Sequence, residues 1–205
     1  MDILKKILFV ACFFLAVQSG YAQTAVQKAF EKSYALETAQ KYTEAITTLK
    51  TVYDPASYEI NLRLGWLYYL AADYKTSATY YKKATEIYPN SVEAKLGYIY
   101  PLSALYSWDE VIVQYKAILK MDAYNSQVNY SLGLIYYYRK DYTTSKTYLD
   151  NAIGAYPFDY DIVVLCAWNN LMLGKNEEAK KLFNRALMLK PNDSSALDGL
   201  KKIAN

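Results

Sequence analysis

The chain of 205 residues contains no histidine. This absence excludes Ser-His-Asp and Cys-His catalytic arrangements and every metal site that uses imidazole. The sequence also lacks a glycine-rich loop that could cradle a phosphate. Pairs of carboxylates, such as Asp159 with Asp161, fall at predicted helix starts, where acidic side chains favour the helix dipole. The sequence therefore predicts a protein that is not an enzyme and that binds no cofactor and no metal.

Cysteine is also scarce, and neither sign of charge predominates. The two cysteines are Cys12 and Cys166, and removal of an N-terminal segment carrying Cys12 would leave no partner for a disulfide. Cys166 lies in the apolar stretch 162–167 and is predicted to be a buried, unreactive thiol. The 23 basic and 20 acidic residues give a net charge of +3, with no concentrated basic patch. We therefore expect no nucleic-acid partner.

A long hydrophobic run occurs only at the start of the chain. Lys5 and Lys6 precede the apolar stretch 7–17, and a small-x-small cleavage signal ends at Ala22. This pattern predicts a bacterial signal peptide over residues 1–22, cleaved near Ala22, and hence a periplasmic or secreted protein. The run is too short to span a bilayer comfortably, so no transmembrane span is expected in the mature chain.

An alternative interpretation of the same segment is a lipoprotein signal. Residues 9–12 loosely match a lipoprotein box, in which Cys12 would be lipidated and would tether the chain to the membrane. The apolar run continues past Cys12 through Phe13, Phe14 and Leu15, whereas a lipidated cysteine normally ends such a run. The sequence therefore argues against lipoprotein anchoring.

The rest of the chain repeats itself. The stretch 132–152 resembles the stretch 64–84, at an offset of two periods of 34 residues. Small or aliphatic residues recur at equivalent places at intervals of 32, 34, 34 and 34: Ala45, Ser77, Val111, Ser145 and Ala179. Large residues follow four positions later: Leu49, Tyr81, Tyr115, Leu149 and Phe183. The period predicts five repeats, about 26–57, 58–91, 92–125, 126–159 and 160–193.

The repeat resembles the tetratricopeptide repeat, a helix-turn-helix unit with a Leu-Gly pair and a tyrosine in its first helix. The pairs Leu64-Gly65, Leu96-Gly97 and Leu132-Gly133 are each followed by a tyrosine, Tyr68, Tyr100 and Tyr136. The resemblance implies an all-α fold, a right-handed superhelical solenoid of helix-turn-helix repeats forming one domain over residues 23–205. The third repeat is predicted to carry two extra residues around Pro101 to Ser107. We expect them to lengthen the turn between its helices, because Pro101 cannot donate a helical hydrogen bond and tends to bend or end the first helix.

Local signals give the helix ends. Asp73 and Asp141 are predicted N-caps of second helices, and Asn90 with Glu93 forms a capping-box pattern. Gly174 is predicted to end a helix. Residues 194–204 are predicted to be a C-terminal capping helix that buries four apolar residues on one face: Ala196, Leu197, Leu200 and Ile203.

Tyrosine is unusually abundant, with 24 residues, and three tryptophans accompany it. In the family that the sequence resembles, the first helices line a concave groove, and this resemblance gives the candidate partner-binding residues. They are Tyr34, Trp66, Tyr69, Tyr98, Tyr130, Tyr137 and Trp168. Any single one of them is equally well explained as a core residue packed on the next repeat. Arg63 and Lys95 are candidates for neutralising an acidic group at the groove's edge.

An aromatic groove suits two kinds of ligand. Tryptophan and tyrosine serve as anchors for a peptide or protein partner, for instance within a cell-envelope complex. The alternative is a glycan or cell-wall ligand stacked on the same rings, which would need paired aromatic platforms beside amides or carboxylates. Capture of a C-terminal carboxylate by Lys and Asn is disfavoured, because the matching places hold Phe30, Tyr34, Leu62, Trp66, Tyr130 and Leu134. The sequence thus predicts a non-catalytic scaffold for a protein partner of unknown identity.

Overall fold

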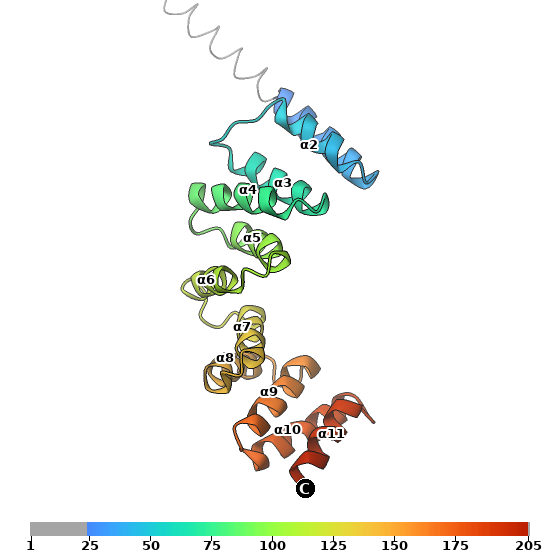
Figure 1. Cartoon of the computed structure of the whole chain (residues 1–205), viewed down its shortest axis with the longest axis vertical. Coiled ribbons are helices and arrows are strands. Elements are labelled where there is room, and N and C mark those ends of the chain that lie inside the picture. The colour runs from blue at the N-terminus through green and yellow to red at the C-terminus, as the bar shows by residue number, and fades with distance from the viewer. Residues whose placement is uncertain (1–23, 205) are drawn as a thin grey trace, which may run out of the picture. The chain divides into compact units, whose positions relative to one another are not determined.

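The computed structural model describes residues 24–204, and within this range it contains helices and turns but no strand (Figure 1). The predicted all-α helical solenoid is confirmed. The predicted signal peptide, its cleavage site and Cys12 lie outside the described residues. No helix between residues 24 and 204 has the length and hydrophobicity needed to cross a membrane. The chain divides into two compact units whose boundary, between Val111 and Ile112, falls inside helix α6 (Trp108–Leu119).

The N-terminal unit begins with a helix over residues 24–38 and continues with α2 (Tyr42–Lys50), α3 (Tyr58–Leu70), α4 (Tyr74–Ile87) and α5 (Val92–Ala104). Helix α3 packs on α4 as a hairpin, and both helices contact α5 (Figure 1). The core between the first two hairpins is aliphatic and includes Leu49, Leu64 and Leu67, which are all fully buried. Each hairpin thus covers an apolar flank of the next one, which is the physical basis of a repeat stack.

The C-terminal unit contains most of α6 and then α7 (Ser126–Tyr138), α8 (Tyr142–Ala155), α9 (Tyr160–Met172), α10 (Asn176–Leu189) and α11 (Ser194–Ala204). The hairpins α7–α8 and α9–α10 pack on each other through α8 and α9, and α11 packs on α9 and α10. Cys166 is buried here, as predicted, and burial raises the pKa of its thiol to about 12. This thiol is therefore protonated at neutral pH and serves as a small core residue.

The N-capping residues of the first helices recur with the 34-residue period of the sequence. The N-caps Ser57, Ser91, Asn125 and Asp159 stand at intervals of 34, and each side chain accepts a hydrogen bond from the amide three residues later. Ser91 therefore caps α5, and the prediction of Asn90 as its cap was wrong by one residue. The predicted caps Asp73 and Asp141 are confirmed for α4 and α8.

The turn inside each hairpin holds one residue with positive φ. These residues are Gln40, Ala72, Tyr106, Lys140 and Gly174, with φ between 58° and 70°. Glycine adopts this left-handed conformation without strain, whereas side chains with a Cβ are disfavoured there. Only the last hairpin uses glycine at the position, and Gly174 follows the end of α9 as predicted.

Small residues allow the two helices of a hairpin to cross closely. A Cβ on Gly65 would lie 2.8 Å from the ring of Tyr81, and one on Gly133 would lie 2.6 Å from the side chain of Leu149. The contact is fixed by a buried hydroxyl, because Ser77 Oγ donates a 2.7 Å hydrogen bond to the carbonyl of Gly65. Ser145 makes the same bond to Gly133.

The predicted insertion in the third repeat was wrong. Helix α5 begins 34 residues after α3 and 34 before α7, so no extra residues occur between Pro101 and Ser107. Ile99, not Gly97, stands at the place of Gly65, and Pro101 lies buried inside α5 rather than ending it. Gly97 instead makes room for the repeat before it, since a Cβ there would lie 2.2 Å from the ring of Tyr81.

The irregular interval belongs to the first repeat. Helix α2 has 9 residues, whereas α4 has 14. The start of α3 follows the start of α2 by 16 residues, compared with 18 from α4 to α5. The shorter second helix, partly offset by a longer connection to α3, accounts for the single interval of 32.

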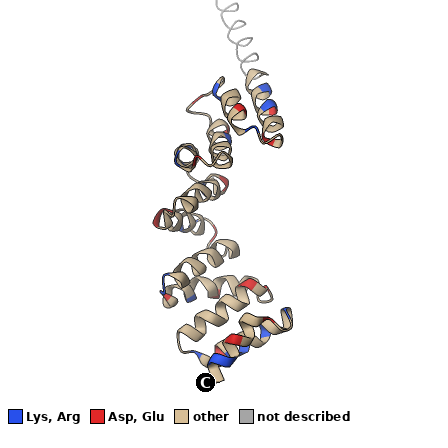
Figure 2. Ribbon diagram, turned by 45° about the vertical axis from the view of Figure 1, so that its right-hand side comes forward, with Lys and Arg blue, Asp and Glu red and all other residues tan. Residues whose placement is uncertain are grey.

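The capping helix α11 covers the last hairpin as predicted. Ala196 and Gly199 are buried, and a Cβ on Gly199 would lie 2.1 Å from the ring of Phe183. Leu197 was predicted to be buried but is 48% exposed, because the packed face of α11 contains Gly199 instead. Charged residues of both signs lie along the outer surface of this helix (Figure 2).

Candidate partner-binding surface

The observed register defines one row of equivalent positions on the first helices. Its members are Tyr34, Trp66, Tyr100, Leu134 and Trp168, at the same intervals of 32, 34, 34 and 34. Tyr98 was predicted on the assumption that Leu96-Gly97 matches Leu64-Gly65. With the insertion removed, Tyr100 takes the place in this row that Tyr98 was expected to hold.

Three aromatic residues of α3 and α5, here called the aromatic cluster, meet in the N-terminal unit. They are Trp66, Tyr69 and Tyr100. The rings of Trp66 and Tyr69 are stacked, with centroids 5.7 Å apart and planes at 24°. The ring of Tyr100 lies 6.1 Å from that of Trp66 and 5.5 Å from that of Tyr69. Tyr100 is nevertheless 51% exposed, so the cluster presents aromatic surface to solvent.

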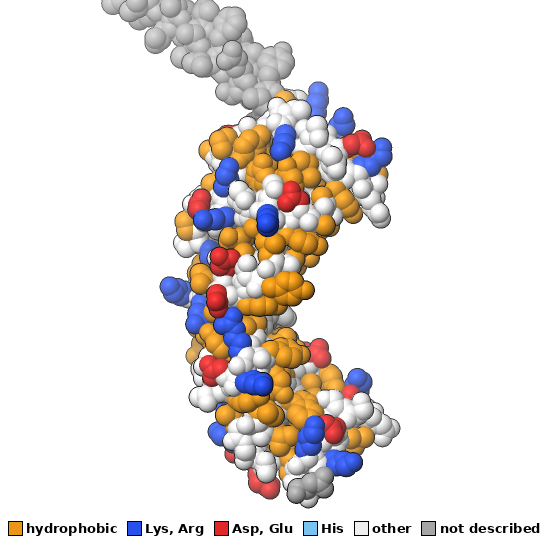
Figure 3. All heavy atoms as spheres, in the orientation of Figure 1, with side chains coloured by type: hydrophobic (Ala, Val, Ile, Leu, Met, Phe, Trp, Pro, Cys, Tyr) orange, Lys and Arg blue, Asp and Glu red, His pale blue; other side chains and the backbone are white. Residues whose placement is uncertain are grey.

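A pocket of about 810 Å³, the N-terminal pocket, opens beside this cluster. Its aromatic lining includes Tyr34, Trp66 and Tyr100, and its aliphatic lining Leu62, Val92 and Leu96. Glu59 and Glu93 contribute carboxylates, and Arg63 is the only cationic residue that lines it. On the face drawn in Figure 3, apolar and tyrosine side chains are widely exposed among polar ones. The pocket combines an apolar wall with a few charged groups, the usual character of a ligand site.

Arg63 is held in a buried network instead of standing free at an edge. It is 6% exposed, forms an ion pair with Glu37 and donates from Nε to Ser33 Oγ at 3.2 Å. The ring of Tyr34 lies over the guanidinium at 3.8 Å. Trp66 Nε1 donates to the same Glu37 at 2.8 Å, so the carboxylate fixes both side chains. Arg63 Nη2 is buried and has no hydrogen-bond partner among the described residues.

Lys95 also has a structural role. Its ammonium donates to the carbonyl of Pro89 in the turn before α5, and burial lowers its pKa. Asn61 and Asn129, at the equivalent positions, donate to the carbonyls of Pro55 and Ala123 in the same way. These side chains hold the turns between repeats. Arg63 and Lys95 are thus both buried and engaged within the chain.

The remaining predicted site residue of the N-terminal unit, Tyr98, lies away from the pocket. It is half-buried, and burial together with Glu110 and Glu86 raises its pKa. Tyr98 thus faces an acidic environment formed by other residues than those that line the pocket. Tyr69 contacts the pocket's aromatic wall through Trp66 and Tyr100 without lining the pocket itself.

The three site residues predicted in the C-terminal unit do not form one cluster. Trp168 lies under the capping helix: its Nε1 donates to Ser195 Oγ at 2.9 Å, and its ring meets Phe183 edge-on at 5.1 Å. The ring of Tyr137 contacts Tyr142 at 5.5 Å and packs on the core around Leu149. Both side chains are therefore largely used for packing.

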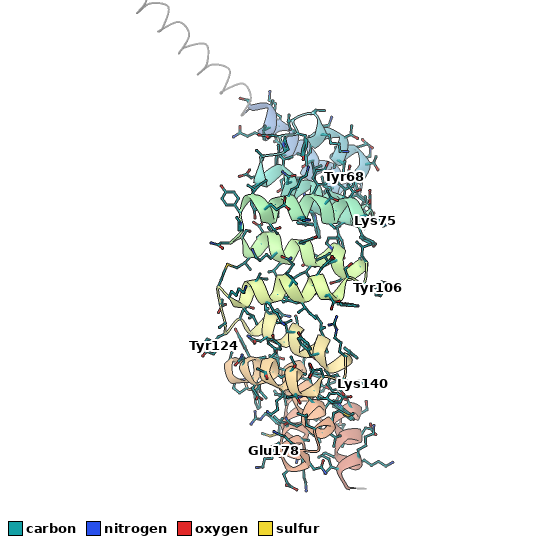
Figure 4. All side chains as sticks on the ribbon, turned by 60° about the vertical axis from the view of Figure 1, so that its left-hand side comes forward. Tyr68, Lys75, Tyr106, Tyr124, Lys140 and Glu178 are labelled. Atoms are coloured by element: carbon teal, nitrogen blue, oxygen red, sulfur yellow. The ribbon has the colours of Figure 1, made fainter. Side chains whose placement is uncertain are left out.

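Tyr130 lines a second pocket, the C-terminal pocket, of about 750 Å³. Its lining combines tyrosines with carboxylates and amides: Tyr124, Tyr130, Tyr156, Asp122, Asp159, Asp161, Asn125 and Gln127. Tyr124 is 76% exposed and projects from the turn before α7, at the opposite end of that helix from Lys140 (Figure 4). Sequence reasoning missed this pocket, because Tyr124 and Tyr156 lie in turns between repeats and outside the first-helix positions that the family pattern selects.

Residues 24–204 contain no grouping of three or more carboxylate or thiol side chains arranged to hold a metal ion. Asp159 accepts from the amide of Ile162 at 3.1 Å at the start of α9, which is the structural role predicted for it.

A stack of 34-residue hairpins closed by a polar capping helix defines the chain as a helical-repeat scaffold. Family models described as tetratricopeptide repeat match residues 60–91 and 130–196. The chain belongs to the tetratricopeptide repeat family, whose members are generally protein-interaction scaffolds, and it is a scaffold of this general kind.

Solved structures share the fold at low sequence identity. A tetratricopeptide repeat protein from Parabacteroides merdae ATCC 43184 is 17% identical with a TM-score of 0.75, over 88% of this chain and 72% of that chain. The MamA protein is 19% identical with a TM-score of 0.71, over 81% of this chain and 92% of that one. MamA AMB-1 is 18% identical with a TM-score of 0.70, over 84% of this chain and 96% of that chain. No curated protein matches the sequence.

Proposed function

We propose that the chain is a non-catalytic scaffold that binds a peptide segment of a protein partner in its N-terminal pocket. The observation that carries this proposal is the convergence of Trp66, Tyr69 and Tyr100 beside a pocket of about 810 Å³. Tryptophan and tyrosine contribute disproportionately to binding energy at protein interfaces, because they offer large rigid surfaces with a polar tip.

The aromatic wall is preorganised for binding. The hydrogen bond from Trp66 Nε1 to Glu37 fixes the indole, and Glu37 is itself held by Arg63. Stacking on Tyr69 limits the movement of the indole further. A side chain whose rotamer is already fixed loses little entropy when a ligand packs on it, which favours affinity.

The proposed setting is the bacterial periplasm or the exterior, with the partner in a cell-envelope complex. The basic start, apolar run and cleavage signal of residues 1–22 support export. This part of the proposal depends on the sequence of that segment alone.

A second candidate function is glycan binding, and the C-terminal pocket favours it. Sugar rings stack on aromatic faces while their hydroxyls bond to amides and carboxylates, and Tyr124 and Tyr156 stand beside Asn125, Gln127 and Asp159. The residues concerned differ from those of the peptide proposal. The two candidates can therefore be separated by mutation.

The test is a selection from a random peptide library on the chain spanning residues 23–205, followed by fluorescence anisotropy with the selected peptides. The peptide proposal predicts that Tyr100→Ala weakens binding by about tenfold or more, the cost expected of an interface anchor. The matched control is Tyr138→Ala, which removes a 76% exposed tyrosine outside both pockets. Selection of no peptide, or equal binding by both variants, would contradict the proposal.

A parallel measurement with an oligosaccharide array addresses the second candidate. Binding that is lost in a Tyr124→Ala, Tyr156→Ala variant and kept in Tyr100→Ala would favour a glycan function of the C-terminal pocket. Loss of glycan binding in Tyr100→Ala alone would instead place the sugar in the N-terminal pocket.

A further inference from the structure

The charges of the N-terminal pocket are distributed unevenly. Glu59 and Glu93 line it from the first turns of α3 and α5, and both are exposed. Arg63, the only cation in the lining, is ion-paired with Glu37. The carboxylates of Glu59 and Glu93 are therefore left without a compensating cation in the pocket lining. A ligand with positive charge would be attracted to this end.

The hydrogen bonds at this end keep the acidic groups in place. Tyr58 Oη donates to Glu93 at 3.0 Å and lies 2.8 Å from Ser91 Oγ, so α3 and α5 are linked at their N-terminal ends. Ser57 Oγ donates to Glu59 at 3.0 Å. Both carboxylates thus accept hydrogen bonds from hydroxyls and retain further acceptor capacity toward a cation.

The aromatic surface lies at the other end of the pocket. Glu59 precedes Trp66 by seven residues on α3, and Glu93 precedes Tyr100 by seven on α5. At about 1.5 Å per residue, the acidic and aromatic ends are separated by roughly 10 Å along the helices. An extended peptide advances about 3.3 Å per residue, so roughly three residues span this distance.

Arg63 does not offset these carboxylates. It follows Glu59 by four residues and precedes Trp66 by three, but it is 6% exposed and its guanidinium is ion-paired with Glu37. The negative charge of Glu59 and Glu93 is therefore left for a ligand to neutralise.

We infer that the N-terminal pocket selects a basic-apolar peptide, with a Lys or Arg side chain at Glu59 and Glu93 and an aromatic or branched aliphatic side chain on Trp66 and Tyr100. The basic and apolar residues lie about three positions apart in an extended segment. This inference rests on the proposed function and adds the chemistry and spacing of the ligand.

The test compares fluorescently labelled peptides on one glycine-serine frame. The first carries Lys and Phe about three positions apart, the second carries Glu in place of Lys, and the third places Lys and Phe next to each other. Fluorescence anisotropy with the chain over residues 23–205 is expected to show at least about tenfold tighter binding of the first peptide than of the other two. The preference over the Glu peptide should weaken with added salt, because exposed charges are screened.

Two variants assign the effect to residues. Glu59→Gln with Glu93→Gln should remove the preference for Lys over Glu and keep binding of the Phe side chain, whereas Tyr100→Ala should weaken all three peptides. Glu178→Gln, on the exposed first turn of α10, is the matched control for removal of a helix-start carboxylate and should change nothing. Circular dichroism confirms that each variant is folded.

The outcomes separate the ligand chemistry from the binding function. Equal binding of the Lys and Glu peptides, with both weakened by Tyr100→Ala, would overturn the inference on ligand charge and leave the peptide-binding function standing. Equal binding of the spaced and adjacent peptides would overturn the inferred spacing in the same way. Failure of these and of library-selected peptides to bind in a Tyr100-dependent manner would overturn the proposed function itself.

Discussion

The two units of the chain are built from the same hairpin and present different surfaces. In the N-terminal unit, Trp66 and Tyr100 contact each other at the edge of an open pocket. In the C-terminal unit the same row holds Leu134, and Trp168 lies beneath the capping helix. The repeat register fixes where a side chain is placed, but the element packed next to it decides whether that side chain is core or binding surface.

One position of the second helices varies within each unit. It holds Leu49 and Tyr81 in the N-terminal unit and Tyr115, Leu149 and Phe183 in the C-terminal unit, where Tyr115 is half-buried and the other residues of the set are buried. Tyr81 fits only because Gly65 and Gly97 lack side chains on its two sides. Tyr81 is therefore a fully packed ionisable group between two glycines, whereas Leu49, Leu149 and Phe183 at the equivalent positions are apolar.

The largest expected effect comes from uncovering Trp168. In a Gly199→Val variant the new side chain would overlap the ring of Phe183, because even a Cβ would lie 2.1 Å from it. We expect a loss of about 3 kcal/mol in the free energy of unfolding and detachment of α11. Iodide quenching of tryptophan fluorescence should rise as Trp168 becomes exposed.

Gly154→Ala is the control for that variant. Gly154 lies inside α8, and a Cβ added there would meet nothing within 4 Å, so alanine should be tolerated or should stabilise the helix by about 0.5–1 kcal/mol. Unchanged quenching and stability in Gly199→Val would show that α11 does not cover Trp168, and the contrast between the units would disappear.

The next effect concerns the turns between repeats. Asn129 is fully buried and its amide donates to the carbonyls of Ala123 and Asn125 at 3.0 and 2.9 Å. Asn129→Ala leaves these carbonyls without that donor and should cost about 2 kcal/mol in urea-induced unfolding. Lys95→Met in the N-terminal unit should cost less, because it also removes the penalty of placing a charge where burial lowers its pKa. A larger loss for Lys95→Met would reverse this ranking.

Alkaline pH is expected to destabilise both units, through different buried groups. Burial raises the pKa of Tyr81 well above its ordinary value of 10, so the folded state keeps the proton that the unfolded state releases. Stability is therefore present below pH 10 and is lost as the pH rises above it, by about 1 kcal/mol per pH unit at first. In the C-terminal unit, burial raises the pKa of both Cys166 and Tyr160 to about 12, so this unit also loses stability as the pH rises.

The measurement is hydrogen exchange followed by mass spectrometry between pH 9 and pH 11, corrected for the intrinsic exchange rate. Peptides from α3, α4 and α5 should lose protection because of Tyr81, and those from α9 because of Cys166. Tyr81→Phe should reduce the loss in α3, α4 and α5 and leave the loss in α9 unchanged, because phenylalanine fills the same space without a titrating group. A loss in α3, α4 and α5 that is unaffected by Tyr81→Phe would count against the assignment.

Much of this organisation could be predicted from the sequence because its causes are local or periodic. The spacing of Ser77, Ser145 and Ala179 gave the hairpins, and Asp73 and Asp141 gave the helix starts. The register of the third repeat was misplaced, because Leu96-Gly97 has the composition of the crossing motif but Gly97 serves Tyr81 of the previous repeat. Composition alone cannot tell which neighbour a small residue accommodates.

The candidate sites were harder to predict than the fold. Trp66 and Tyr69 were identified from the family pattern, and the same pattern selected Trp168, whose exposure depends on α11. The role of Arg63 depends on Glu37, which lies on a different helix and 26 residues earlier. The C-terminal pocket draws on turn residues such as Tyr124, and turns carry no periodic signal of burial. Tertiary contacts of this kind are not encoded in the spacing of a repeat.

The smallest expected effect on stability is at Tyr124, and its size is informative about function. Because the side chain is 76% exposed, Tyr124→Ser should change the free energy of unfolding by less than about 0.5 kcal/mol, as should Tyr138→Ser at equal exposure. Thermal unfolding followed by circular dichroism measures both. A loss above about 1 kcal/mol would mean that Tyr124 packs on the protein. A neutral result would mean that folding does not require this aromatic ring, which leaves its face available to a ligand of the C-terminal pocket.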